Sequence, residues 1–183
     1  SKFFEPVDCV LKNNNFTRFN PHHSGGRIEI LNDDFILLST GDFKNLSLSQ
    51  NDNSMFGKII LINKKNKQYK IVSKGLRNPQ GMYVDNSNSL IISTDHGPEG
   101  GDEINLQKIN DTKVANFGWS ISSYGEHYGF KSKDEKNELY KIAPLHKSHQ
   151  DFGFVEPIKY FSPGIGISQV EKFSPQSNEK KYL

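Results

Sequence analysis

The sequence predicts an all-β protein built from repeated antiparallel hairpins, and three observations support this prediction. Aromatic residues are plentiful, with 13 Phe and 7 Tyr, in a chain rich in glycine and polar turn residues. Short apolar runs alternate with those turn residues along the chain. The hairpin expected at 28–40 also recurs 54 residues later, where Ser39-Thr40 returns as Ser93-Thr94. A repeat of about 40 to 55 residues with roughly four strands is typical of a propeller blade.

The elements are expected in the following order. Residues 1–20 have no clear period and are expected to form a loop-rich lead-in. The runs at 28–31 and 35–38 flank Asn32-Asp33-Asp34, a typical hairpin turn. Further strands are expected at 57–62, paired with 69–72; at 82–84, paired with 90–92; at 102–106; and at 157–161, paired with 165–173, with a third repeat starting near Gly164.

The repeat also aligns polar residues that are distant in sequence. At the 54-residue offset, His23 falls on Arg77 and Asp42 falls on His96. If the two units are adjacent blades, these four side chains lie at one rim around one axis. The segment 76–105, which carries dense polar and glycine residues at both ends of its hairpin, is therefore expected to supply part of a site.

Composition excludes several classes of protein. The net charge is only +2 and no basic stripe is interleaved with aromatics, so no nucleic-acid partner is expected. The lysines at 64–67 are interpreted as a solvated hairpin tip. The single cysteine, Cys9, excludes a disulfide framework. No apolar run is long enough for a membrane span, and no signal peptide is visible.

The remaining part of the chain is expected to be peripheral. Residues 131–150 are charged and aperiodic, which predicts a surface insertion in which His146 and His149 are solvated. Trp119, Tyr124 and Tyr128 are interpreted as packing or pocket-rim residues. About three blades do not close a ring and would leave sticky sheet edges, so the chain is expected to be a piece of a longer protein.

Six segments occur in an order and at a spacing that are specific as a series. They are His23-Ser24-Gly25-Gly26-Arg27-Ile28; Ser39-Thr40-Gly41-Asp42; Gly57-Lys58-Ile59; Leu76-Arg77-Asn78-Pro79-Gln80-Gly81; His96-Gly97-Pro98 with Gly100-Gly101-Asp102-Glu103-Ile104-Asn105; and Asn116-Phe117-Gly118-Trp119. With these segments the chain resembles the soluble sugar dehydrogenases that use pyrroloquinoline quinone (PQQ), the glucose/sorbosone dehydrogenase family of six-bladed β-propellers. The resemblance implies that residues 1–183 form one incomplete domain, a partial propeller of about three blades of four-stranded antiparallel sheets.

The resemblance also implies an activity. The family oxidises an aldose-type sugar hydroxyl by hydride transfer to calcium-bound PQQ, in the periplasm or outside the cell, and passes electrons to an external acceptor. His23 resembles the general base and Asp42 the carboxylate that orients it. Arg77 resembles the residue that faces the quinone oxygen as negative charge develops. Asn78 and Gln80 would hydrogen-bond the rim of the cofactor. On the residues alone, the simpler interpretation is that His23 is a turn residue and Asp42 a turn cap, while Arg77 could be a surface ion-pair partner.

The cofactor and metal residues follow from the same resemblance. His96 is assigned to the pocket wall. Gly97 and Pro98 resemble the segment whose backbone carbonyls hold the calcium that bridges to PQQ, and hard oxygen atoms are what calcium prefers. Glu103 resembles a ligand of a second, structural calcium. Phe117 stands where the family commonly has Tyr, which leaves its backbone carbonyl as the expected ligand.

Two other functions remain open at this point. The first is a non-catalytic propeller of the same superfamily that acts as a binding module. The second is a calcium-dependent hydrolase such as a propeller lactonase, which would need several inward carboxylates, whereas only Asp42 and Asp95 are candidates. Because the family's later cofactor contacts lie beyond this chain, the 183 residues alone are expected to bind PQQ weakly and to turn over no sugar.

Overall fold

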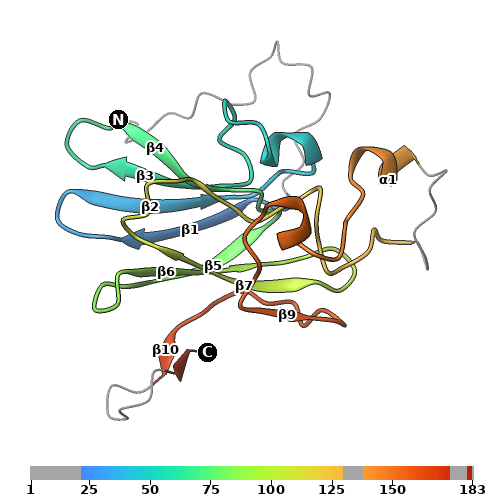
Figure 1. The fold of residues 1–183 in the computed structure, drawn as a ribbon. Helices are drawn as coiled ribbons and strands as arrows, with labels where there is room; N and C mark the ends of the chain where they lie inside the picture. Colours follow the sequence, from blue (N-terminus) through green and yellow to red (C-terminus); the bar gives the residue numbers. More distant parts are fainter. Residues whose placement is uncertain (1–21, 130–137, 174–180, 183) are drawn as a thin grey trace.

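The computed structural model describes residues 22–129, 138–173 and 181–182, which fold mainly into two antiparallel sheets (Figure 1). Cys9, the expected lead-in at 1–20 and the first part of the expected insertion, 131–137, lie outside the described residues. None of the helices among the described residues is long and apolar enough to cross a bilayer. The two sheets confirm the prediction of a mainly β fold.

The first sheet has the strand order β1-β2-β3-β4-β8. Neighbours from β1 to β4 pair antiparallel, while the short β8 pairs parallel to β4. The pairing of the strands expected at 57–62 and 69–72 is confirmed. The bounds are β1 Gly25–Ile30, β2 Phe35–Thr40, β3 Lys58–Asn63, β4 Tyr69–Lys74 and β8 Ala115–Asn116, with a 3₁₀ turn, η1 Leu46–Ser49, between β2 and β3.

The second sheet has the order β5-β6-β7-β9, and all its neighbouring strands pair antiparallel. Its bounds are β5 Pro79–Asp85, β6 Leu90–Asp95, β7 Asp102–Lys108 and β9 Lys159–Phe161. Four antiparallel strands in this order correspond to one blade of the predicted repeat. The described residues thus contain two blade-like sheets, not three. A separate two-stranded ribbon is formed by β10 Lys172–Phe173 and β11 Lys181–Tyr182.

The prediction that 157–161 pairs with 165–173 is wrong. Strand β9 pairs with β7 instead, with Glu103 opposite Tyr160. The physical reason is that the outer edge of β7 offers unpaired N–H and C=O groups, and β9 covers them after a long excursion of the chain. The segment between β9 and β10 forms no strand.

The two repeated hairpins differ by one residue, so a constant 54-residue offset is also wrong. In the first hairpin, the Leu31 N–H donates to the Phe35 carbonyl and closes a turn of Asn32-Asp33-Asp34. In the second, Asp85 pairs with Leu90 around the longer turn 86–89. The starts of β1 and β5 remain 54 residues apart, so His23 and Arg77 are equivalent. The ends of β2 and β6 are 55 apart, so Gly97 is the equivalent of Asp42, and His96 precedes it.

The main core lies between the two sheets. Buried side chains from the first sheet meet Met82 and Ile91 from the second, and the cluster comprises Leu37, Ile59, Leu76, Met82, Ile91, Ala115 and Phe117. Complete burial of one such side chain contributes about 1.5–3 kcal/mol. Polar contacts reinforce the packing, because Ser39 Oγ donates to the Pro79 carbonyl at 2.7 Å. The Ser39 hydroxyl also accepts the backbone N–H of Arg27 in β1 at 3.0 Å, so it links the two inner strands, β1 and β5.

The segment expected to be a surface insertion is instead partly built into the fold. Helix α1, Glu138–Ile142, lies beside the sheets (Figure 1), and η2 spans Gln150–Phe152. Tyr140 and Leu145 pack with Trp119 in a second core cluster. His149 is 0% exposed, so the prediction that it is solvated is wrong, whereas His146 is half-buried and stacks on Phe152. The apolar residues spaced among the charges of this segment account for its burial.

Candidate functional site

A polar pocket lies where the chain enters β1 and β5 and leaves β6. It has a volume of about 500 Å³. Five predicted site residues line it although they are far apart in sequence, and the full lining comprises His22, His23, Ser24, Lys44, Arg77, Asn78, Gln80, His96 and Tyr128. The fold therefore collects residues from two blade-like sheets at one rim. Tyr128, which we expected only at a pocket rim or in packing, is 60% exposed and belongs to this lining.

His23 and Asp42 form a hydrogen-bonded pair. The distance between His23 Nδ1 and Asp42 Oδ1 is 2.9 Å, and the Asp42 side chain is fully buried. Asp42 also accepts hydrogen bonds from the Lys44 backbone N–H at 2.8 Å and from Trp119 Nε1 at 2.7 Å. Because three N–H groups converge on this carboxylate, we assign the hydrogen of the His23 ring to Nδ1. The Nε2 atom is then the proton acceptor of the ring.

Glycine at position 41 makes the approach of these two segments possible. A Cβ atom on Gly41 would lie 1.8 Å from the His23 carbonyl oxygen, which is far inside contact distance. The Phe43 N–H donates to that same oxygen at 3.1 Å, and His23 has a φ of 59°. A side chain at position 41 would therefore push His23 away from Asp42.

Arg77 is a buried cation at the base of the pocket. Its side chain is 5% exposed, and Nη1 donates to the carbonyls of His96 at 2.8 Å and Gly97 at 2.7 Å. Its guanidinium carbon lies 5.5 Å from the Trp119 ring centroid and 5.9 Å from that of Tyr128. Burial lowers the pKa of Arg77, against the opposite effect of nearby Asp42 and Asp95. Arginine nevertheless stays charged, so this corner presents a fixed positive charge.

Asp95 holds the backbone on which Arg77 and Asn78 sit. Its two carboxylate oxygens accept the N–H groups of Arg77 at 2.8 Å and Asn78 at 2.6 Å. Burial, reinforced by the charge of Glu103, raises the pKa of the Asp95 carboxyl to about 8. The side-chain oxygen of Asn78 accepts the Gly25 N–H at 3.0 Å, which ties the two inner strands together. The amide nitrogen of Asn78 is left as its donor toward the pocket.

Asp102 organises the loop that follows β6. Its Oδ2 accepts three backbone N–H groups from residues 165–167, and its Oδ1 accepts the Gly97 N–H at 2.9 Å. His96 Nδ1 lies 3.0 Å from the same Oδ1. The loop is tight, since a Cβ atom on Gly97 would lie 2.2 Å from the Gly101 carbonyl oxygen. One buried carboxylate thus fixes His96 and Gly97 relative to a segment some 60 residues further along the chain.

The residues predicted to bind metal gather around a second, small cavity behind Arg77. Its volume of about 10 Å³ matches a single water-sized particle. Gly97, Pro98, Glu103 and Phe117 all line it, together with Asp95. Gly97 and Pro98 thus lie at this cavity and are not part of the lining of the larger pocket.

The atoms near this cavity suit a hard cation. Glu103 and Asp95 are buried carboxylates that repel one another, and a cation between them would relieve that repulsion. The neighbouring Asn105 Oδ1 is buried without a hydrogen-bond partner. Among the described residues, no three side chains of His, Cys, Asp or Glu are grouped as a metal site, so a calcium ion would also need backbone carbonyl oxygens. Such a donor set fits calcium better than a transition metal.

A buried polar cluster beside this cavity was missed by sequence reasoning. His149 Nε2 lies 3.4 Å from Glu103 Oε1, and neither ring nitrogen of His149 meets a hydrogen-bond partner in the described structure. The His149 ring stacks on Tyr124, whose hydroxyl donates to Glu156 at 2.7 Å. Burial, together with the Glu156 carboxylate, raises the pKa of Tyr124. The sequence offered no signal for this cluster, because its members come from three separate segments.

Trp119 is the other residue whose role only the structure shows. Of the two predicted roles, packing or pocket rim, the structure supports packing, because Trp119 is 4% exposed in the second core cluster. Its indole N–H, however, binds Asp42, and its ring lies against Arg77. A single tryptophan directly after Asn116-Phe117-Gly118 was the available signal.

The fold and the pocket together define a class: a chain of blade-like antiparallel sheets with a histidine–aspartate pair and a buried arginine at one rim. Comparison with known proteins agrees with this class. The model of the family described as Glucose / Sorbosone dehydrogenase matches residues 4–180. The chain belongs to this family.

Individual relatives are similar along most of the chain. It is 28% identical over 181 residues to the aldose sugar dehydrogenase YliI of Escherichia coli K12, covering 88% of this chain and 44% of that protein. It is 30% identical over 175 residues to the uncharacterized protein slr1608 of a Synechocystis strain, covering 83% and 39% of the two chains. The chain therefore spans less than half the length of the curated relatives it matches.

Solved structures show the same fold. The apo form of the soluble aldose sugar dehydrogenase from Escherichia coli superposes with a TM-score of 0.66 at 24% identity, over 83% of this chain and 44% of that one. The PQQ-bound aldose sugar dehydrogenase from Streptomyces coelicolor gives a TM-score of 0.55 at 23% identity, over 80% and 38%. The two sheets thus correspond to roughly two fifths of such chains.

Proposed function

We propose that the protein to which this chain belongs oxidises a hydroxyl of an aldose-type sugar, with PQQ and calcium as cofactors. Membership of the glucose/sorbosone dehydrogenase family supports a sugar oxidoreductase. The observation that carries the proposal is the pocket in which His23, held by Asp42 at 2.9 Å, faces the same space as Arg77. A base and a fixed cation at one rim are what removal of a hydroxyl proton and transfer of a hydride require.

In this proposal, His23 accepts the hydroxyl proton. Its Nδ1 is committed to Asp42, so Nε2 receives the proton, and the buried carboxylate stabilises the imidazolium that forms. The hydrogen bonds from Lys44 and Trp119 keep Asp42 in place during this transfer. The His23 side chain is 15% exposed, which leaves the ring accessible from the pocket while restricting its rotation.

Arg77 supplies the positive charge in the same proposal. Because its Nη1 is anchored on two carbonyls, the guanidinium does not need to reorganise when negative charge develops nearby. PQQ, when bound with calcium, supplies the hydride acceptor, and the calcium acts as a Lewis acid. Arg77, Asn78, Gln80 and His96 line the pocket and would hold the cofactor. Its calcium would be held by Gly97 and Pro98, which line the small cavity that shares Arg77 with the pocket, and the Gly97 carbonyl also accepts the Arg77 hydrogen bond.

A second, structural calcium completes the proposal. Glu103 and the Phe117 carbonyl would bind it, together with the nearby oxygen atoms of Asp95 and Asn105. This part rests on the donor chemistry of the small cavity, where the single charge of Arg77 lies beside two buried carboxyl groups, Asp95 and Glu103, and where the nearby Asn105 Oδ1 lacks a hydrogen-bond partner. Binding of calcium by the isolated chain, measured calorimetrically, would test it separately from catalysis.

The experiment that tests the activity uses the full-length gene product with PQQ and calcium. Dye-linked oxidation is measured for several aldoses, and His23→Ala is compared with His146→Ala, which removes a histidine outside the pocket. Loss of the general base is expected to lower kcat by about 10²–10⁴-fold, while His146→Ala leaves it unchanged. An unchanged rate in His23→Ala would overturn the assignment, and tight sugar binding without oxidation would instead indicate a non-catalytic binding module.

A further inference from the structure

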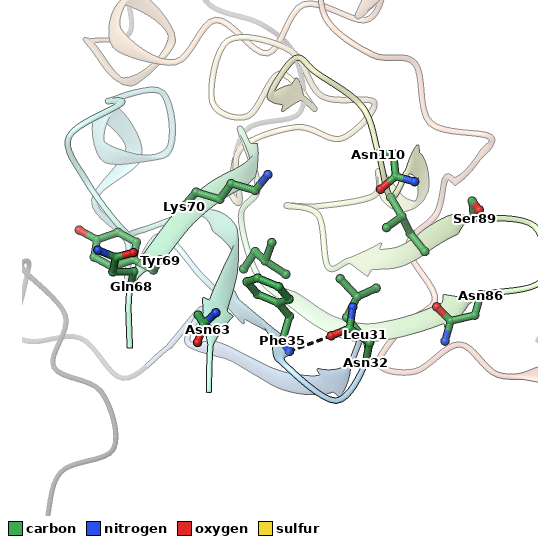
Figure 2. Close-up of a pocket in the computed structure, with 12 residues that line it drawn as sticks. Leu31, Asn32, Phe35, Asn63, Gln68, Tyr69, Lys70, Asn86, Ser89 and Asn110 are labelled. Carbon is green, nitrogen blue, oxygen red and sulfur yellow. Dashed lines mark hydrogen bonds between the residues drawn. The ribbon is translucent and has the colours of Figure 1, made fainter. Parts of the chain in front are cut away.

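A second pocket lies at the opposite ends of the strands from the proposed sugar site. It has a volume of about 680 Å³, within the range of small-molecule sites. Figure 2 shows that its lining residues come from the hairpin ends of both sheets. They lie in the turns after β1, β3 and β5, directly after β7, and at the adjoining ends of β2, β3 and β4. The lining comprises Leu31, Asn32, Phe35, Leu61, Asn63, Gln68, Tyr69, Lys70, Asn86, Ser89, Ile109 and Asn110. Because both walls belong to this chain, the pocket does not depend on further blades for its lining.

The lining combines an apolar floor with a polar rim. Leu31, Phe35, Leu61 and Ile109 are partly buried and form the inner surface. Three of them, Leu31, Leu61 and Ile109, also pack on the main core between the sheets, so the floor is a continuation of that core. The rim carries five carboxamide side chains, the Ser89 hydroxyl and the Lys70 ammonium group.

The hydrogen bonds within the turns orient two of these carboxamides. Asn32 Oδ1 accepts the backbone N–H groups of Asp34 and Phe35, each at 3.0 Å, and one of these bonds is drawn in Figure 2. Asn63 Oδ1 likewise accepts the N–H groups of Lys65 and Asn66. A backbone N–H can only donate, so the atom that receives it must be the amide oxygen. The NH₂ groups of Asn32 and Asn63 are consequently left as donors.

The same reasoning fixes a third carboxamide. Asn66 Oδ1 accepts the backbone N–H of Gln68 at 2.9 Å, so the other amide atom of Asn66 is nitrogen. That nitrogen donates to Gln68 at 3.2 Å, and the accepting atom of Gln68 is therefore its oxygen. Gln68, like Asn32 and Asn63, offers its NH₂ group as the remaining donor at the rim.

The charge around the pocket, like the free NH₂ donors, favours a ligand that accepts hydrogen bonds and is negatively charged. No acidic side chain is among the residues that line the pocket, whereas Lys70 is exposed and extends from β4 across it (Figure 2). An adjoining groove shares Lys70 and Ile109 and adds Lys108 and Lys113 against a single carboxylate, Asp111. Donors and positive charge thus surround an apolar floor.

We propose that this pocket binds a small amphipathic carboxylate, whose apolar body covers Phe35 and Ile109 and whose carboxylate meets Lys70 and the rim amides. An ionised carboxylate only accepts hydrogen bonds, so it complements the donor groups of Asn32, Asn63 and Gln68. The apolar tail would replace water over the half-buried floor. This site is separate from the proposed sugar pocket, which is built at the other ends of the same strands.

The test is a calorimetric titration of the purified protein with octanoate at low ionic strength, with octan-1-ol as the matched neutral ligand. Octanoate is expected to bind one site with a Kd about tenfold or more below that of octan-1-ol, because a hydrogen-bonded charge pair is added. Hexanoate is expected to bind about tenfold more weakly than octanoate, because it lacks two methylene groups.

The variant Lys70→Met keeps the aliphatic stem and removes the charge. It is expected to raise the Kd for octanoate about fivefold or more and to leave that for octan-1-ol unchanged. Lys159→Met, on β9 and outside the pocket, is the control and should bind octanoate normally. Equal binding of octanoate and octan-1-ol, unaltered binding by Lys70→Met, or no saturation up to about 10 mM octanoate would each overturn the proposal.

Discussion

The indole N–H of Trp119 donates a 2.7 Å hydrogen bond to Asp42, a residue 77 positions earlier in the chain. This bond joins the loop after β8 to the loop after β2, and through Asp42 it reaches the ring of His23. The Trp119 ring also lies 5.5 Å from the guanidinium carbon of Arg77. One aromatic side chain therefore contacts Asp42 and Arg77, two of the three side chains to which the proposed reaction assigns roles.

Replacing Trp119 with Phe tests this arrangement. The ring is largely kept while the N–H donor to a buried carboxylate is lost, an interaction worth about 1.5–3 kcal/mol. For the proposed activity of the full-length protein, we expect kcat to fall roughly tenfold with a smaller change in KM. The pH dependence of kcat should also shift, because His23 is held less firmly. A change in KM alone, with the pH profile intact, would contradict a positioning role for Trp119.

Asp102 is expected to be sensitive even to an isosteric change. Both of its oxygens accept N–H groups, so in Asp102→Asn either orientation of the amide points an NH₂ group at other donors. We expect a loss of about 3 kcal/mol or more in the free energy of unfolding, measured by denaturant titration. The control is Asp111→Asn, which changes an exposed carboxylate. A loss of stability in Asp102→Asn no larger than that in the control would show that Asp102 does not hold the loop after β6 in place.

A pH effect is expected from the contact between α1 and the rest of the fold. Glu126 accepts a hydrogen bond from Tyr140 at 2.6 Å and pairs with Lys147 at 2.6 Å. Partial burial opposes ionisation of Glu126, but Lys147 and Tyr140 outweigh it and lower its pKa below the ordinary value of 4.5. The folded state therefore binds its proton less readily than the unfolded state, so this contribution is present above pH 4.5 and is lost as the pH falls through the lower, folded-state pKa.

The measurement is denaturant unfolding of the parent protein and Glu126→Gln over acid and neutral pH. Because Glu126 is partly exposed, we expect a difference on the order of 0.5–1 kcal/mol near neutral pH that shrinks on acidification. Glu99→Gln, a change of an exposed side chain nearby, should show no such pH-dependent difference. A difference for Glu126→Gln that stays constant down to acid pH would speak against the linkage.

The 183-residue chain is expected to bind PQQ weakly and to oxidise no sugar by itself. It spans less than half the length of the relatives it matches. Its two sheets therefore form only part of the wall that the proposed cofactor site would need. A PQQ titration followed by absorbance, in parallel with dye reduction, measures both properties. Tight binding together with turnover by this chain would show that the two sheets suffice.

The hairpins were predictable because their signals are local. Apolar runs separated by Asn32-Asp33-Asp34, or by the polar turn at 86–89, specify antiparallel strands whatever the rest of the chain does. The one-residue difference between the two turns was not predictable from the repeated letters, because register depends on which backbone groups close each turn. The same limit led to the wrong pairing of β9, whose partner β7 lies some 50 residues earlier.

The sequence by itself determined the residue types of the site and, through the spacing of the repeat, that His23 and Arg77 would share a rim. Tertiary structure alone decided which groups hold them: Trp119 on Asp42, Asp95 beneath Arg77, and Asp102 across the loop after β6. It also decided that His149 is buried. The physical reason is that a buried polar side chain must find its partner wherever the fold brings one, and that partner leaves no mark at a fixed distance in the sequence.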